Sequence, residues 1–303
     1  MASSVPAPLE PQSIAAERMY AERAATYEDS WHPDYTARLM TLIPLRPGDH
    51  VLSLCCGTGL DAFASARAVG PQGRVVGVDV SEPMLSVARA KLQARTAAAQ
   101  QRGSANEKEE AEAPVVFLRH DVTNLDGLDE GAKKEVPKGG FDAIICSSAF
   151  VLFPNPAGVV RHWREYLKPG GLLVVDIAHE RNMRSGLVME KVAKRLGKTY
   201  PSDRAWIKSR DSFRDILVQE GFVVESITEL EKVAGRRSTY LTLDRADEQF
   251  DYVVNSSLAN PVMTDEFKQQ ARPIFKEEFA KMAVDGKVEV VETLYVYVAR
   301  KGD

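Results

Sequence analysis

Short apolar runs alternate with longer amphipathic stretches through most of this chain. The stretches with helical spacing cover about residues 61–69, 82–95, 156–167 and 209–220. The apolar runs cover residues 50–54, 74–80, 115–120, 141–146, 172–177, 222–227 and 288–299. Strands that are apolar nearly throughout are buried on both faces, so the alternation predicts an α/β fold with a doubly wound, mostly parallel, seven-stranded sheet. The last run alternates at its start, which favours an antiparallel final strand.

Segments outside this alternation suggest how the chain is divided. Residues 1–12 are rich in Pro, Ser and Ala, which predicts a disordered tail. Residues 13–47 have helical patterning and are expected to form an N-terminal lid, followed by the α/β core over residues 48–230. Residues 231–286 are too long for a simple connection and are rich in Phe and Tyr, which predicts an inserted helical cap. Residues 287–303 are then expected to form the final strand of the core sheet.

Several strands of the predicted sheet end in residues that suit a nucleoside ligand. The first strand leads into Gly57-Thr58-Gly59 and a helix, where glycines permit a tight turn and the helix N-terminus presents free N–H groups. The second strand ends in Asp79, about 20 residues further on, where a carboxylate can accept both hydroxyls of a ribose. Asp121 follows the third strand and can accept from an exocyclic amine such as adenine N6. Parallel strands end at one edge of a sheet, so a ligand crevice is expected there.

The glycine turn by itself does not identify the ligand. Gly57, Gly59 and Ala62 also fit the loose G-x-G-x-x-G/A pattern of nicotinamide-dependent enzymes. An NAD(P)-dependent oxidoreductase is therefore an alternative interpretation of these residues.

Residues 48–175 resemble a class I S-adenosylmethionine-dependent methyltransferase. The runs LCCGTGLDAFA and VVGVDVSEPMLSVARAK are most similar to the branch of C-methyltransferases from ubiquinone and menaquinone biosynthesis, and YLKPGGLLVV resembles the turn before that family's fifth strand. The resemblance implies S-adenosylmethionine as cofactor and S-adenosylhomocysteine as product. It implies cofactor contacts for Tyr27, Cys55, Cys56, Gly57, Thr58, Gly59, Asp79, Val80, Met84, Asp121, Val122 and Ser147.

The chain departs from the family pattern at two positions of the first strand and turn. The family usually has an acidic residue where this chain has Ser53, and the change removes a carboxylate that often supports the methionine amino group. The family usually has a glycine where this chain has Cys55, which predicts a slightly different backbone path. These departures leave open a relative that binds the cofactor without methylating anything.

The N-terminal segment is similar to the family's lid, in which an aromatic side chain closes over the cofactor. Tyr20, Trp31 and, beyond the fourth strand, Phe150 are candidate contacts to the methyl acceptor. Tyr20 and Tyr27 lie seven residues apart, so they can equally form a plain core stripe on a helix.

Two histidines are candidate general bases. His32 lies in the predicted lid and His179 lies just past the fifth strand, where the family forms its acceptor pocket. Each can also be an incidental polar residue near a helix end. The insertion over residues 231–286 is expected to roof the pocket with aromatic and aliphatic side chains, which favours a lipophilic acceptor.

Charge and cysteine content narrow the possible partners. A net charge of −4 and a pI near 5.9 provide no attraction for a phosphate backbone, so no nucleic-acid partner is expected. Cys55, Cys56 and Cys146 lack metal-ligand spacing and favour a reducing compartment with no metal site. There is no membrane-spanning run and no secretory signal, so a cytoplasmic enzyme that methylates carbon, oxygen or nitrogen of a small, largely apolar molecule is expected. The sequence does not indicate an oligomeric state.

Overall fold

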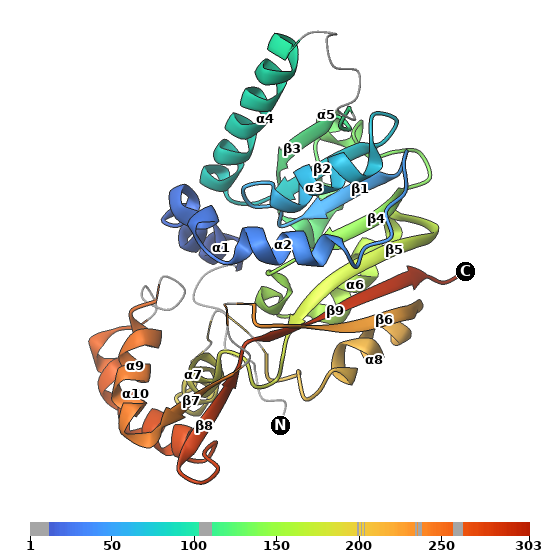
Figure 1. Ribbon diagram of the computed structural model, residues 1–303. Helices are drawn as coiled ribbons and strands as arrows, with labels where there is room; N and C mark the ends of the chain where they lie inside the picture. Colours follow the sequence, from blue (N-terminus) through green and yellow to red (C-terminus); the bar gives the residue numbers. More distant parts are fainter. Residues whose placement is uncertain are drawn as a thin grey trace.

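The computed structural model describes residues 12–102, 111–198, 200, 202, 204–233, 235, 238–256 and 263–303. Its main sheet has seven strands in the order β3-β2-β1-β4-β5-β9-β6 (Figure 1). The strands are β1 (His50–Leu54), β2 (Arg74–Asp79), β3 (Val115–Arg119), β4 (Phe141–Cys146), β5 (Leu167–Ala178), β6 (Phe222–Glu231) and β9 (Thr293–Lys301). The first five pair in parallel, and β9 runs antiparallel between β5 and β6. The predicted doubly wound sheet with an antiparallel last strand is therefore confirmed.

Helices cover both faces of this sheet. The α-helices of this part are α1 (Gln12–Ala21), α2 (His32–Met40), α3 (Leu60–Val69), α4 (Glu82–Arg102), α5 (Glu130–Lys133), α6 (Pro156–Glu165) and α8 (Asp211–Gln219). Short 3-10 helices are η1 (Ala24–Asp29), η3 (Val122–Gly127) and η4 (Phe150–Leu152). The helical patterning over residues 13–47 is thus divided among α1, η1 and α2.

Alternate residues of the central strands belong to two separate hydrophobic clusters. Leu52, Val76 and Ile144 belong to the cluster that also contains Trp163 of α6 and Phe213 of α8. Their neighbours Val51, Val75 and Ala143 belong to the second cluster, which includes residues of α2 and α3. Successive side chains of a strand point to opposite faces, so a strand between two helical layers must be apolar at nearly every position.

The register of the parallel strands brings the candidate site residues to one edge. Leu54 pairs with Val78 on one side and with Cys146 on the other. Asp79 pairs with Arg119, the last residue of β3. The segments that follow β1, β2, β3 and β4 therefore leave the sheet at the same level, as the sequence predicts.

A second, smaller unit forms the cap. It consists of α7 (Arg184–Arg195), β7 (Ser238–Thr242), η5 (Leu243–Arg245), α9 (Ala246–Val254), α10 (Asp265–Ala280) and β8 (Lys287–Val291). Its hydrophobic cluster is centred on the fully buried side chains of Phe250, Phe275 and Phe279. Figure 1 shows the cap at the lower end of the molecule, beyond the main sheet.

The cap differs from the prediction in two respects. Helix α7 precedes β6 in the chain, yet Val188 and Val192 belong to the cap cluster. The run predicted as one final strand over residues 287–303 is two strands, because β8 pairs with β7 in a separate two-stranded sheet and β9 begins only at Thr293. The prediction of a single strand is wrong because each half is buried in its own sheet, which leaves the apolar pattern continuous across the break.

Two further predictions concern the N-terminal tail and membrane-spanning segments. The disordered tail predicted for residues 1–12 lies, apart from Gln12, outside the described residues. No helix in the described ranges has both the length and the apolar character needed to cross a lipid bilayer.

Candidate active site

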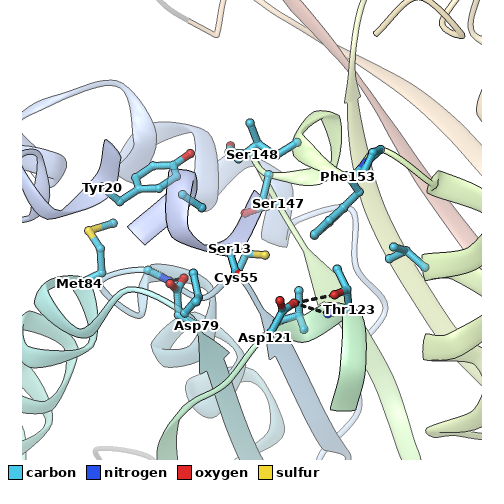
Figure 2. A pocket seen from close by; sticks show the side chains of 18 of the residues that line it. Ser13, Tyr20, Cys55, Asp79, Met84, Asp121, Thr123, Ser147, Ser148 and Phe153 are labelled. Atoms are coloured by element: carbon cyan, nitrogen blue, oxygen red, sulfur yellow. Dashed lines mark hydrogen bonds between the residues drawn. The ribbon is translucent and has the colours of Figure 1, made fainter. Parts of the chain in front are cut away.

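A cavity of about 490 Å³ lies at the carboxyl edge of the parallel strands. Figure 2 shows Asp79 and Asp121 on one side of it, Ser147 and Ser148 on the other, with Tyr20 and Met84 toward one end and Phe153 toward the other. The predicted site residues that line it are Tyr20, Tyr27, Cys55, Gly57, Asp79, Val80, Met84, Asp121, Val122 and Ser147. The lining residues not predicted from sequence are Ser13, Ala16, Thr123, Ser148, Ala149, Leu152, Phe153, Pro154, Asn155, Gly158 and Val159.

The turn after β1 depends on left-handed backbone conformations. Gly57 and Gly59 have φ values of 52° and 85°. A Cβ on Gly57 would lie 3.0 Å from Met84 Cε, so this position also needs the space of a missing side chain. Cys55 itself has a φ of 53°, the left-handed region that a glycine enters without strain. Cys55 therefore bears the strain of a backbone conformation that a glycine adopts freely.

Asp79 connects the ends of β1 and β2. Its Oδ2 accepts a hydrogen bond from the Gly57 N–H at 2.8 Å, and its Oδ1 accepts from the Ser81 N–H at 2.8 Å. The residue is 9% exposed, and burial raises the pKa of its carboxyl although the backbone hydrogen bonds oppose this. Each carboxylate oxygen can accept more than one hydrogen bond, so an oriented carboxylate remains available to two ligand hydroxyls.

Asp121 is fixed in a similar way at the end of β3. Its Oδ1 accepts from the Thr123 N–H at 2.9 Å and from the Thr123 hydroxyl at 2.7 Å, which caps η3. The carbonyl of Val122 accepts from Trp163 Nε1 at 2.8 Å in the buried core. The corner formed by Asp121 and Val122 is thus held rigidly against the cavity.

Comparisons with known proteins agree with this geometry. A family model described as a methyltransferase domain matches residues 52–173. The chain is 30% identical to the demethylmenaquinone methyltransferase of Lactococcus lactis over 193 residues, which are 61% of this chain and 67% of the relative. The chain belongs to the class I S-adenosylmethionine-dependent methyltransferases.

This methyltransferase also resembles another curated relative over a smaller part of its length and two solved structures over most of it. It is 34% identical to the nocamycin O-methyltransferase of Saccharothrix syringae over 134 residues, which are 44% of this chain and 39% of the relative. Among solved structures, the [4+2]-cyclase SpnF has a TM-score of 0.53 at 16% identity and covers 97% of this chain and 98% of its own. A protein from Bacillus halodurans C-125 that is assigned to the methyltransferases has a TM-score of 0.51 at 22% identity, covering 88% of this chain and 99% of its own. These structural likenesses show the fold.

The cofactor of the methyltransferase is S-adenosylmethionine, and the pocket residues suit it. Asp79 and Asp121 present carboxylates from neighbouring strand ends, which matches the hydroxyls and exocyclic amine of a nucleoside. Val122 and Met84 add apolar surface to the lining of the same cavity. Of the other predicted cofactor contacts, Cys56, Thr58 and Gly59 do not line the cavity.

Those three residues support the turn from behind. Cys56 and Thr58 are buried, and the Thr58 hydroxyl donates to Glu28 Oε1 of η1 at 2.5 Å. Gly59 caps α3, and a Cβ there would lie 2.9 Å from the rings of Phe63 and Phe117.

His32 lies in a stack of aromatic rings behind the lid. Its ring centroid is 4.1 Å from that of Tyr27 and 4.0 Å from that of Trp31, and its Nδ1 lies 2.6 Å from the Ser30 hydroxyl. Burial, assisted by the positive charge of Arg23, lowers the pKa of His32 to about 4. The ring is neutral at neutral pH, but neither it nor Trp31 lines the cavity.

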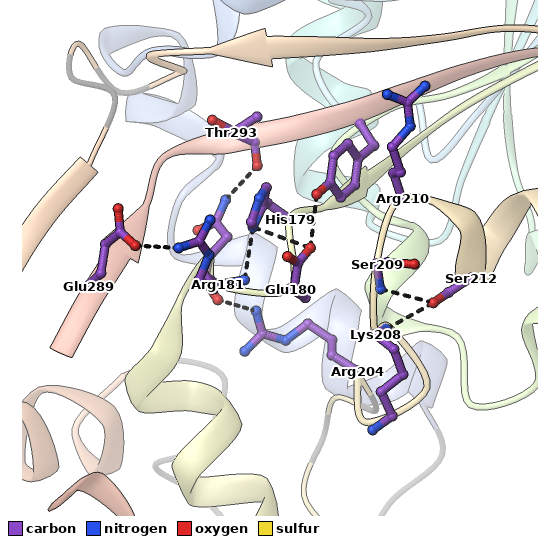
Figure 3. A network of polar contacts seen from close by, with 12 residues as sticks. His179, Glu180, Arg181, Arg204, Lys208, Ser209, Arg210, Ser212, Glu289 and Thr293 are labelled. Carbon is purple, nitrogen blue, oxygen red and sulfur yellow. Dashed lines mark hydrogen bonds and ion pairs between the residues drawn. The ribbon is translucent and has the colours of Figure 1, made fainter. Parts of the chain in front are cut away.

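His179 lies in a separate polar network between the main sheet and the cap (Figure 3). Its ring stacks on Tyr295 with 5.0 Å between centroids, and its Nδ1 accepts from the Arg181 N–H at 3.0 Å. Cys146 pairs with Val175, so Asp176 is level with Ser147 and His179 lies three residues further along, about 10 Å at the usual rise of a strand. This placement offers no support for the predicted role of His179 as a base.

Of the predicted acceptor contacts, Tyr20 lines the cavity, whereas Trp31 and Phe150 do not. Phe150 is 1% exposed and packs in the core against Phe213 and Trp163, with centroid distances of 4.8 and 5.7 Å. No described residue of the insertion over 231–286 lines the cavity, so its described part does not form the predicted roof. The N-terminal segment forms this boundary instead, through Ser13, Ala16, Tyr20 and Tyr27. The sequence predicts helical structure over this segment, but it does not show which of its residues face the pocket.

Proposed function

We propose that this methyltransferase methylates a carbon, oxygen or nitrogen atom of a small, largely apolar organic molecule. The observation that carries the proposal is the composition of one pocket wall. Leu152, Phe153, Pro154 and Val159 line the same cavity as the two strand-end carboxylates. A site of several hundred cubic ångströms with apolar walls and a few placed polar groups is typical of small-molecule binding.

The relatives support a small acceptor. They include a demethylmenaquinone methyltransferase and a nocamycin O-methyltransferase, whose names specify small organic molecules. The chain spans well under half of the nocamycin enzyme, so its own acceptor is inferred from the pocket.

When bound, S-adenosylmethionine supplies an activated methyl group. The chain's own residues therefore have to bind the cofactor, orient the acceptor and exclude water from the site. Asp79 and Asp121 bind the nucleoside. Tyr20 keeps its phenolic proton at neutral pH and does not act as a base, because burial raises its pKa to about 12. No histidine of the described ranges lines the cavity, which favours an acceptor atom that is nucleophilic without a strong protein base.

Ion pairs hold the N-terminal segment over the cavity. Glu17 of α1 accepts from Arg119 at 2.6 Å, and Glu28 of η1 accepts from Lys91 of α4. Lys91 also donates to the carbonyl of Thr58 at 3.0 Å, so the segment is tied to the glycine turn. A segment held in this way excludes water from the methyl-transfer site.

The test combines ligand binding with turnover. We expect calorimetry to show binding of S-adenosylhomocysteine and none of NAD(P)H, and a panel of aromatic, quinone-like and polyketide-like molecules to include a methylated product detected by mass spectrometry. Binding of NAD(P)H alone would contradict the assignment of the pocket. Binding of S-adenosylhomocysteine without any methylated product would favour a non-methylating role.

A further inference from the structure

The cofactor carries positive charge at one end, but the charged lining residues suit its other end. S-adenosylmethionine has a sulfonium and an ammonium group beside a single carboxylate. Of the residues that line the cavity in the described chain, only Asp79 and Asp121 have charged side chains, and both suit the nucleoside. Ser53, at the position where the family usually has an acid, is completely buried, and its hydroxyl has no hydrogen-bond partner among the described residues. The positively charged end of the cofactor therefore needs a negative charge from a residue that does not line the cavity.

Two buried carboxylates lie directly behind the opposite wall. Ser147 and Ser148 follow β4 and line the cavity. The Ser147 hydroxyl donates to Asp61 Oδ2 of α3, and the Ser148 N–H lies 2.9 Å from each carboxylate oxygen of Asp176 of β5. Asp61 is 6% exposed and Asp176 is 3% exposed. Each serine of this wall is thus held from behind by its own acid.

Two consecutive residues of helix α2 donate hydrogen bonds to these two carboxylates. The Thr36 hydroxyl donates to Asp61 Oδ1 at 3.1 Å, and the Tyr35 hydroxyl donates to Asp176 Oδ2. Among the described residues neither carboxylate has an ion-pair partner, and burial raises the pKa of both. A buried carboxylate that is hydrogen-bonded but not paired with a cation is costly, and a cation bound nearby removes part of that cost.

We propose that Asp61 acts through Ser147 as a positioning residue for the amino-acid end of S-adenosylmethionine, in place of the carboxylate that is missing at Ser53. The inference rests on the proposed function of this pocket and names how its positive end is recognised. Ser147 orients its hydroxyl oxygen toward the cavity because its proton is donated to Asp61, and the charge of Asp61 acts over a short path through a low-dielectric interior.

Asp61 is better suited to this role than Asp176. Its partner is a side-chain hydroxyl on the pocket wall, whereas Asp176 accepts from a backbone N–H and from Tyr35. Burial raises the pKa of Asp176 to about 7, so Asp176 is partly neutral at physiological pH.

The experiment compares three ligands that differ in their charged end. Asp61→Asn keeps the shape of the side chain and removes its charge. S-adenosylmethionine and S-adenosylhomocysteine both carry the amino-acid group, whereas 5′-methylthioadenosine carries only the nucleoside and the thioether. We expect calorimetry to show that Asp61→Asn binds S-adenosylmethionine and S-adenosylhomocysteine about tenfold more weakly, which is the scale of one lost charge-assisted hydrogen bond. Its affinity for 5′-methylthioadenosine should be unchanged.

Matched variants separate this role from a purely structural one. Ser147→Ala keeps Asp61 and breaks the contact, so it should give the same selective pattern even if Asp61→Asn folds poorly. Asp79→Asn should weaken the binding of all three ligands by the same factor, because each contains the ribose. Equal losses for all three ligands in both Asp61→Asn and Ser147→Ala, or no loss in either, would overturn the inference. Failure of the wild-type protein to bind any of the three would instead overturn the proposed function.

Discussion

The pocket edge of the core and the cap both bury large aromatic side chains, but they use them differently. In the cap, Phe275 packs against Phe250 and Phe279 with centroid distances of 5.5 and 6.0 Å, and all three are completely buried in a cluster of their own. At the pocket edge, Tyr20 and Tyr27 lie edge to face at 6.3 Å and line a cavity. An aromatic-rich insertion therefore need not be part of a binding site when it is large enough to bury its own apolar surface.

The two regions also treat charge differently. Ion pairs on the cap, such as Arg272 with Asp247 and Lys281 with Glu277, involve side chains that are about half exposed and contribute little stability. Asp61, Asp79 and Asp176 are buried at the pocket edge without a basic partner among the described residues. A buried charge without a partner lowers the stability of the fold but can bind a ligand. We therefore expect the cap and the core to supply most of the folding stability, and this edge of the sheet to bind the ligands.

The largest effect is expected from the cap cluster. Phe275→Ala should lower the free energy of unfolding by about 3–5 kcal/mol, because it leaves a cavity among buried rings. Chemical denaturation measures this loss, and the folded variant should bind S-adenosylhomocysteine as the wild type does. Tyr252→Ala is the control, since Tyr252 is 72% exposed on the same unit. A loss of affinity in the folded Phe275 variant would show that the cap shapes the pocket.

The next effect concerns pH and the pocket edge. Burial raises the pKa of Asp176 from 3.8 to about 7. Below about pH 4 the group is protonated in both the folded and unfolded states, and between pH 4 and 7 only the unfolded state loses its proton. The free energy of unfolding should therefore fall as the pH rises through this range, by up to about 4 kcal/mol, and stay low above it. Asp176→Asn should remove this dependence in urea denaturation curves; the same slope in both proteins would show that other groups cause it.

Replacing Asp79 is expected to have a smaller effect, on the affinity for the cofactor. Asp79→Ala removes a buried acceptor and is expected to weaken S-adenosylhomocysteine binding by ~1–3 kcal/mol, measured by calorimetry. Asp142→Ala is the control, because Asp142 starts β4 and instead binds Lys168 and the His50 N–H. Unchanged affinity in the Asp79 variant would mean that the ribose is held elsewhere.

The smallest effect is expected at the junction between the two regions. His179→Ala should cost about 1 kcal/mol of stability, since it removes a hydrogen bond with Arg181 and a stacking contact with Tyr295. Cofactor affinity and turnover should not change. A large fall in turnover at unchanged affinity would restore the role of His179 as a base that the sequence suggests.

Much of the candidate site follows from sequence because it depends on local patterns and one topological rule. Gly57, Asp79 and Asp121 each lie at the end of an apolar run, and parallel strands end together. His179 was misplaced because the apolar run of β5 does not show that this strand extends past the pocket. Phe150 was misplaced because an aromatic residue after a strand has the same pattern whether it faces a ligand or Trp163.

Local sequence patterns are enough to predict the α/β sheet, the glycine turn and the two acids at neighbouring strand ends. By contrast, local sequence does not show that Asp61 and Asp176 lie behind Ser147 and Ser148, or that Tyr35 and Thr36 donate to them. The same packing leaves the cavity without any described residue of the insertion, which the sequence assigns to its roof. The physical reason is that hydrophobic periodicity encodes which face of an element is buried, whereas the partner of a buried polar group depends on how separate elements pack together.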